Sequence, residues 1–351
     1  MNMKQDKDFA AKVWWENQQT TKQYLSDIKN AVVDYKKMVV SQIAWSDCFR
    51  KIITGMARDQ GFSVYPFNCR DYSSEDSSCL LDWIVDTVGL QADYYGTVES
   101  IRNELGKGKG LWIFWNLSEE QCDELDELSV QLDKAGVQIS FIVLSVPQRL
   151  PSMVSMEHQY SDVDLYFFTW DILMQKNSTD LIEYKAILIN QFAHGKPERI
   201  AECCNEADQC VCSPADVCTW LSGEQLSRDR YRAQLRYLMP LLEMARYEIC
   251  RNFKGRLHDV RFPYTERFNN NPKSVNVYDD ADQFEFRHWY YFNDCGNIRY
   301  LTPEEKECLK TLYKARNDLA HLRMIEEYDE LTKVVSYCLN FWKRYSDVES
   351  I

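Results

Sequence analysis

The chain has 351 residues, of which 45% are hydrophobic, and its formal net charge is −13. This composition is sufficient for about two folded domains with real cores, and it excludes a disordered chain. Because a uniformly acidic surface repels nucleic acid, any nucleic-acid site has to be a local basic patch.

The N-terminal residues 1–22 are polar and charged, and they lack the apolar core of a signal peptide. No stretch approaches the roughly 18 apolar residues of a membrane span. We therefore expect a cytoplasmic protein without a membrane partner.

Apolar, strand-like runs alternate with helix-like segments between residues 38 and 200. This alternation predicts a parallel sheet covered by helices. From Asp180 onward the apolar spacing becomes helical, which predicts an all-α bundle in the C-terminal half. The expected strands are 38–42, 62–67, 110–117, 137–145 and 164–170, and the expected helices include 47–60, 74–90, 118–136, 223–253 and 302–325.

These patterns divide the chain into four expected segments. They are an N-terminal helical segment (1–37), an α/β domain (38–200), a cysteine-rich connector (201–226) and a helical bundle (227–351). A polar stretch at 269–286 is expected to be a loop or an insertion within the bundle.

The order of elements in the α/β domain resembles a P-loop ATPase core of the signal-transduction or AAA-like type. In that resemblance the loop 42–51, QIAWSDCFRK, occupies the phosphate-binding position. A working loop needs glycines, so that backbone N–H groups can wrap the phosphates. This loop has none, and Trp45 and Asp47 would put bulk and negative charge beside a phosphate.

The strand 110–117 departs from the same pattern, since it ends in Trp115 and Asn116 where an acid should hold magnesium. We therefore predict a degenerate ATPase-like domain that binds no cofactor, does not hydrolyse ATP and serves as a scaffold or sensor. An unrelated α/β domain with the same order of elements is the alternative.

The stretch KARNDLAHLR, residues 314–323, carries the most specific polar pattern of the C-terminal half. A helical wheel that starts at Leu309 places Arg316 on the apolar face. A charge in that position has to pair with an acid or meet an interface. Asn317 and His321 are four residues apart, so they share a face, and an Asn amide there can fix the imidazole tautomer.

Arg316, Asn317 and His321 also resemble the signature of HEPN-family ribonucleases, an Arg followed four to six residues later by a His within a helical bundle. The resemblance covers about the last third of the chain. It implies metal-independent RNA cleavage, with His321 as general base or acid and Arg316 on the phosphate. It also implies a homodimer through the bundle. Arg316 and His321 are about 140° apart on a straight helix, so one copy would converge poorly, and either two copies or a helix break near Asn317 would bring them closer.

A local basic excess lies between Ser227 and Arg261, with nine basic and four acidic residues. Within it, Arg246, Arg251, Lys254 and Arg256 are the predicted RNA-binding residues. A solvated helix face is the alternative interpretation. The other four histidines, His158, His194, His258 and His288, have no close partner in the sequence.

Thirteen cysteines are scattered along the chain, and five of them cluster as Cys203, Cys204, Cys210, Cys212 and Cys218. Thiolates at close spacing can hold zinc, but this spacing is not two CxxC knuckles and Pro214 interrupts it. Reduced, mostly buried thiols are the favoured interpretation, so we predict no metal.

Two functions from different classes fit these observations. One is a HEPN-type ribonuclease or RNA-binding effector of a prokaryotic stress or antiviral defence system, with the pseudo-ATPase domain as its sensor. The other is a non-enzymatic adaptor whose acidic α/β domain docks a true ATPase or another protein effector. The geometry at Arg316 and His321 discriminates between them, because a nuclease needs both in a shared, solvent-reaching cleft.

Overall fold

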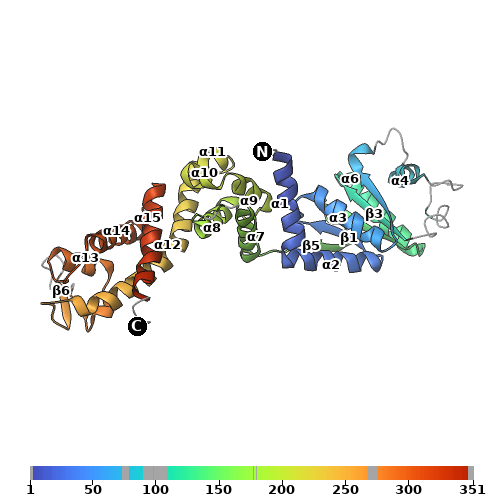
Figure 1. Cartoon of the computed structure of the whole chain (residues 1–351). Coiled ribbons are helices and arrows are strands. Elements are labelled where there is room, and N and C mark those ends of the chain that lie inside the picture. Colours follow the sequence, from blue (N-terminus) through green and yellow to red (C-terminus); the bar gives the residue numbers. More distant parts are fainter. Residues whose placement is uncertain are drawn as a thin grey trace. The chain divides into compact units, whose positions relative to one another are not determined.

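The computed structural model describes residues 3–72, 79–89, 98, 109–176, 178, 180–267 and 275–346 (Figure 1). The chain divides into two compact units. Unit 1 consists of Met1–Ile172 and Lys196–Ala201, and unit 2 of Leu173–Gly195 and Glu202–Ile351. This division differs from the four expected segments, since 1–37 belongs to unit 1 and nearly all of 201–226 to unit 2.

A five-stranded parallel sheet forms the centre of unit 1, in the order β2-β3-β4-β1-β5. Its strands are β1 (Lys37–Ser41), β2 (Ser63–Asn68), β3 (Gly110–Trp115), β4 (Ile139–Leu144) and β5 (Val154–Glu157). The first four lie where the apolar runs predicted them. The parallel α/β fold expected for the N-terminal part is thereby confirmed.

Alternating side chains of the strands point to opposite faces of the sheet. Phe114 is paired in register with Phe67 on one side and with Val143 on the other, and these side chains belong to one core cluster. Leu125 and Leu128 of α6 (Glu119–Lys134) and Ile84 of α4 (Leu80–Val88) complete that cluster. On the opposite face, the Ser140 hydroxyl donates to the Val32 carbonyl of α2 at 2.7 Å.

The remaining helices of unit 1 pack around this sheet. They are α1 (Met3–Asn17), α2 (Gln19–Val33), α3 (Ser46–Asp59) and most of α7 (Asp162–Gln175). The helix α6 begins at the predicted cap, where the Ser118 hydroxyl accepts from the Gln121 N–H at 3.2 Å.

The predicted strand 164–170 is wrong, because these residues belong to the helix α7. Leu165, Phe168 and Ile172 lie one helical turn apart and are all buried, so the run has a helical face as well as a β-like composition. Ser161 and Asp164 bond to each other at its start, which caps a helix. The fifth strand is β5, which the sequence pattern missed.

Unit 2 is helix-rich, as expected. Its helices are α8 (Ile182–Ala193), the end of α9 (Pro197–Asn205), α10 (Ala207–Cys212), α11 (Pro214–Val217), α12 (Gly223–Phe253), α13 (Phe286–Asp294), α14 (Pro303–Ala320) and α15 (Tyr328–Ser346). The Thr302 cap of α14 is confirmed, with a capping box to Glu305.

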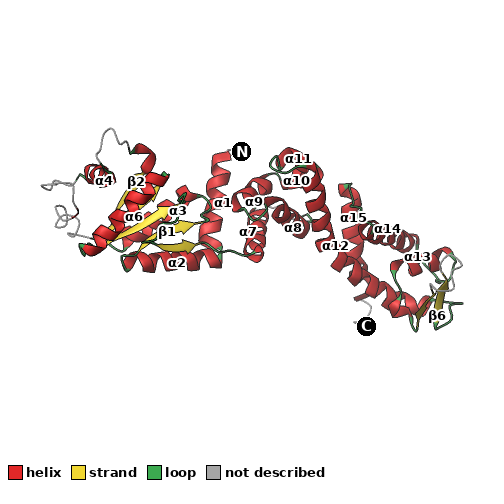
Figure 2. Cartoon of the chain, turned by 180° about the vertical axis from the view of Figure 1, so that it is seen from behind, coloured by secondary structure: helices red, strands yellow, loops and turns green. Residues whose placement is uncertain are grey.

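An antiparallel ribbon of β6 (Tyr264–Arg267) and β7 (Val275–Tyr278) interrupts the helices of unit 2, as the yellow arrow of β6 shows in Figure 2. The sequence predicted no strand there, and all of the intervening residues, 268–274, lie outside the described part of the chain. Among the described helices, none is both long and apolar enough to cross a membrane.

Candidate functional site

The loop after β1 lies at the carboxyl edge of the parallel sheet, where α/β proteins usually bind ligands. Two of its residues, Gln42 and Trp45, have a left-handed backbone, with φ of 56° and 48°. Without glycine this conformation is uncommon. The loop then leads directly into α3 at Ser46.

The start of α3 is already occupied by a carboxylate of the same unit. The Trp45 N–H donates to Glu198 Oε1 at 3.1 Å, and the Trp45 ring lies near Trp14 and Phe168, with centroids 6.5 and 5.9 Å away. A helix N-terminus attracts anions, so the Glu198 carboxylate occupies the region that a phosphate would use. The region where a nucleotide phosphate would bind is therefore occupied by a carboxylate, which would repel it, and by aromatic side chains.

The end of β3 shows the second expected departure. Asn116 also has a left-handed backbone (φ 59°), and its Nδ2 donates to Asn68 Oδ1 at 2.8 Å. The guanidinium of Arg50 lies over the Trp115 ring at 3.9 Å and pairs with Asp47. At this edge lie the Asn116 amide and the stacked Trp115 and Arg50 side chains. A magnesium ion would need a carboxylate there.

A pocket of about 600 Å³ lies in unit 2, among β7, the start of α13 and the end of α14. All three residues of the predicted catalytic motif line it. The lining consists of Asn276, Tyr278, Glu285, Phe286, Arg287, Tyr313, Arg316, Asn317 and His321.

Arg316, Asn317 and His321 lie at the C-terminal end of one helix. The helix α14 ends at Ala320, and His321 caps it with φ −102° and ψ 23°, while its N–H still bonds the Asn317 carbonyl at 3.1 Å. One copy of the chain brings the three side chains to one pocket.

Arg316 is not buried in the apolar stripe as the wheel predicted. The stripe is formed by Leu309, Leu312, Ala315 and Leu319, and Arg316 lies at its border with 42% of its side chain exposed. Its Nη2 is 3.8 Å from Glu285 Oε2, which is a loose ion pair. The guanidinium therefore remains accessible to a ligand in the pocket.

His321 is exposed, and no hydrogen-bond partner of its imidazole is found in the described part of the chain. The predicted bond between Asn317 and His321 is likewise not among the contacts there. Both side chains lie on the pocket wall with their polar atoms available.

A second arginine, Arg287, lines the same pocket, which sequence reasoning missed. Its Nη2 is 3.3 Å from Glu266 Oε2, and the same oxygen is 2.9 Å from His288 Nε2. His288 Nδ1 accepts the Glu285 N–H at 2.9 Å, which assigns the ring proton to Nε2. Burial lowers the pKa of His288, so a neutral imidazole holds the Glu266 carboxylate beneath Arg287.

Three of the four predicted RNA-binding residues are engaged in holding the fold of unit 2. Arg246 bonds Glu243 and the carbonyls of Asp282 and Phe284, with only 15% of its side chain exposed. Lys254 pairs with Asp282.

Arg256 binds both oxygens of Glu305, at 2.8 and 3.1 Å. Arg251 is half exposed, 3.9 Å from Glu248. A role of these four residues in RNA binding stays a prediction, and the arginines that line the pocket are Arg287 and Arg316.

The other histidines have partners that the sequence did not indicate. His194 Nε2 lies 2.6 Å from the buried Asp229, and His258 bonds Asp259 and the Gly296 carbonyl. His158 is enclosed by aromatic rings. We assign none of them to the pocket.

Three of the five clustered cysteines converge. The Sγ atoms of Cys203, Cys210 and Cys218 all lie within 4.8 Å of one another and are buried. Cys204 is buried outside this group, and Cys212 is exposed. The knuckle-spacing rule missed the convergence because it assumes a single hairpin, whereas these residues come from three successive helices.

No protein-family model matches the chain, and neither does any curated protein. Among solved structures, the chain is similar to the Holliday junction branch migration motor RuvB of Thermotoga maritima, with a TM-score of 0.34 and 9% identity, over 66% of this chain and 74% of that chain. It is also similar to a chain of Drosophila ORC bound to DNA, with a TM-score of 0.35 and 11% identity, over 95% of this chain and 73% of that chain. Likenesses of this strength assign neither a family nor a ligand.

Proposed function

We propose that unit 2 is a HEPN-type endoribonuclease module that cuts RNA without a metal ion at the pocket lined by Arg316, Asn317 and His321. The observation that carries the proposal is the convergence of these side chains, from a motif with a ribonuclease-like spacing, on one pocket of about 600 Å³. The presence of Arg287 as a second cation in the same wall adds to it. A purely structural network would instead bury and bond the motif.

The pocket chemistry suits a single-stranded RNA segment. Two guanidinium groups can bind the oxygens of a phosphate, and Arg is well matched to that geometry. Tyr278, Phe286 and Tyr313 offer faces on which an unstacked base can lie. Asn276 and Asn317 offer hydrogen bonds to a sugar or a base edge.

In the proposed reaction the RNA 2′-oxygen attacks the adjacent phosphorus and loses its proton to His321. The 5′-oxygen leaves and takes up a proton, so the products are a 2′,3′-cyclic phosphate and a 5′-hydroxyl. Arg316 neutralises the developing charge on the phosphorane oxygens. A homodimer would bring a second His321 as the acid, as the family resemblance implies.

Unit 1 is proposed to be a nucleotide-incompetent scaffold or sensing domain. The Glu198 carboxylate at the start of α3 supports this interpretation. The same observation is compatible with an adaptor whose acidic unit 1 docks another protein, so nuclease activity has to be tested directly. The defence or stress setting, like the partner, is inferred from the resemblance.

The decisive experiment is RNA cleavage by the full-length protein in EDTA, with end-group analysis of the products. His321→Ala should reduce cleavage about 10²–10⁴-fold, the usual contribution of a positioned proton-transfer group. Because His321 is exposed, the variant should melt like the wild type. Unchanged cleavage by His321→Ala, or a variant that fails to fold, would favour a structural role for the histidine.

A further inference from the structure

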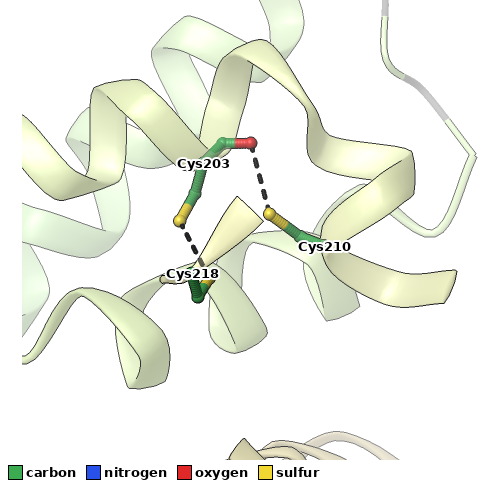
Figure 3. A group of neighbouring side chains, drawn as sticks. All are labelled: Cys203, Cys210 and Cys218. Carbon is green, nitrogen blue, oxygen red and sulfur yellow. Dashed lines mark hydrogen bonds between the residues drawn. The ribbon is translucent and has the colours of Figure 1, made fainter. Parts of the chain in front are cut away.

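The segment between Pro197 and Cys218 contains three short helices, and three of its cysteines meet at a common point (Figure 3). Cys203 belongs to the last turn of α9, Cys210 to the middle of α10, and Cys218 directly follows α11. The Cys203 and Cys218 sulfurs are 3.6 Å apart, and the Cys210 sulfur lies 3.5 Å from the Cys203 carbonyl oxygen. The side chains of Cys203 and Cys218 point toward each other in Figure 3.

The environment of these sulfurs is closed to solvent. All three residues have 0% exposure. Ala207 and Val211, which belong to the same segment, are also buried. No lysine, arginine or histidine in the described part of the chain donates a hydrogen bond to the three sulfurs. Three sulfur atoms that could bind a metal therefore lie close together, and no cationic side chain is hydrogen-bonded to them.

A thiolate is the form that binds metals. A buried anion without a counter-charge is costly, and a cation placed among the three sulfurs would supply that charge.

We propose that Cys203, Cys210 and Cys218 form a buried thiolate site for one thiophilic metal ion, either Zn²⁺ or Cu⁺. Soft thiolate ligands select these ions. A metal–sulfur bond of about 2.3 Å places sulfurs around a shared ion roughly 4 Å apart, close to the spacing already present. Binding releases the thiol protons to solvent as the three sulfur–metal bonds form.

Zn²⁺ and Cu⁺ differ in the number of ligands that they require. Among the described residues, no further His, Cys, Asp or Glu joins this group. Zn²⁺ in structural sites is four-coordinate, so it would need a water as its fourth ligand. Cu⁺ is satisfied by three thiolates.

Such an ion would hold together helices that are short of intrinsic stability. α10 has 6 residues and α11 has 4, and isolated helices of this length are not stable in water. An ion that binds only the folded state stabilises it by mass action. The bound ion would thus stabilise the segment that precedes the long helix α12.

The rival chemistry is a disulfide between Cys203 and Cys218, whose sulfurs are nearly in contact. It would oxidise both thiols to one S–S bond and would leave Cys210 as a free thiol. Mass spectrometry distinguishes the two cases, because a disulfide removes two hydrogens from the chain, whereas a bound ion adds its own mass less that of the protons it displaces.

The test begins with reduced, metal-free full-length protein, loaded with Zn²⁺ or, under anaerobic conditions, with Cu⁺. We expect one ion per chain on at least one of the two arms and a higher melting temperature for the loaded protein. Co²⁺ added to the wild type should give sulfur-to-metal charge-transfer absorption. This readout does not depend on whether any variant folds.

The variants locate the site. Cys203→Ala, Cys210→Ala and Cys218→Ala should each lose the ion, whereas Cys204→Ala, a buried neighbour, and Cys212→Ala, an exposed one, should retain it. Three outcomes would overturn the proposal: no stoichiometric ion on either arm, equal loss in the two control variants, or a Cys203–Cys218 disulfide in protein purified without oxidant.

Discussion

Arg316 lines the pocket of unit 2 while making only a loose contact with the rest of the fold. Its ion pair with Glu285 is 3.8 Å long and about 40% exposed on both sides. Pairs of this kind contribute about 0–1 kcal/mol. Replacement of Arg316 should therefore change function far more than stability, contrary to the expectation from the helical wheel.

We predict that Arg316→Lys reduces RNA cleavage about 100-fold or more and changes the melting temperature little. An ammonium cannot make the bidentate contact to a phosphorane, and loss of one such donor typically costs about 10²–10³-fold in rate. Arg323→Lys is the matched control, because Arg323 is 73% exposed and does not line the pocket. Equal losses in both variants would show that the loss does not depend on the pocket, and full activity of Arg316→Lys would contradict the assignment.

His158 is a fully buried titratable residue of unit 1. It follows β5, has 0% exposure and stacks between Trp15 and Tyr24, with centroids 5.4 and 4.7 Å away. Neither ring nitrogen finds a hydrogen-bond partner in the described structure. Burial lowers the pKa of His158 to about 4, against a smaller opposing effect of Asp164.

This environment predicts a stability that falls with acidification. The unfolded chain takes up a proton on His158 near pH 6.5, whereas the folded chain stays neutral there until about pH 4. The free energy of unfolding should thus decrease by about 2 kcal/mol between pH 7.5 and 5 through this residue alone.

Denaturant titrations at these two pH values, followed by tryptophan fluorescence, measure the effect of His158. His158→Phe should keep the aromatic packing and lose this part of the pH dependence. His258→Phe is the control, because His258 bonds Asp259 at the surface. An unaltered pH dependence in His158→Phe would show that other groups cause it.

At the scale of elements, the start of α3 determines whether unit 1 can hold a nucleotide. Glu198 accepts from the Trp45 N–H there, and the Trp45 ring fills the space with Trp14 and Phe168. We predict no measurable ATP turnover and no calorimetric ATP binding at micromolar concentration. Glu198→Gln should not restore binding, because the loop still lacks glycine. Micromolar binding of ATP by the wild type that Trp45→Ala abolishes would contradict this prediction.

Elements whose sequence fits either a strand or a helix, but not both, could be predicted. Elements whose sequence fits both could not. The strands β1 to β4 are bounded by turns and too short for helices, and Thr302 marks the start of α14 unambiguously. The run 164–170 has the composition of a strand and also the apolar spacing of a helix. Only the capping residues at its start distinguish the helix from the strand. The pocket could not be predicted for another reason, since Asn276, Glu285 and Arg287 lie 29 to 40 residues before Arg316 in the sequence.

At the scale of the whole molecule, the two units exchange segments of chain near their boundary. Leu173–Gly195 belongs to unit 2, and Lys196–Ala201 returns to unit 1. The sequence placed the boundary at 200–201 because the helical spacing of α8 resembles that of any helix beside a sheet. Packing decides otherwise, since α8 lies along α12 and Tyr184 is 5.7 Å from Tyr237, centroid to centroid.

The boundary predicts which fragments fold. The α8 side chains Leu188, Ile189 and Phe192 are fully buried, and each contributes about 1.5–3 kcal/mol by burial. Their sum is comparable with the whole stability of a typical domain, about 5–15 kcal/mol. A fragment of residues 173–351 should thus melt cooperatively, whereas a fragment of residues 227–351 should lack a cooperative transition.

Circular dichroism melts and limited proteolysis of the two fragments test this difference. Phe192→Ala in the longer fragment is the internal check, because removal of a buried Phe should cost about 3–5 kcal/mol and lower the melting temperature. Ile182→Ala, at the partly exposed start of α8, should have a smaller effect. If the 227–351 fragment melts as sharply and at the same temperature as the longer one, α8 is not part of the core of unit 2. The boundary at 200–201 would then describe the folding units better.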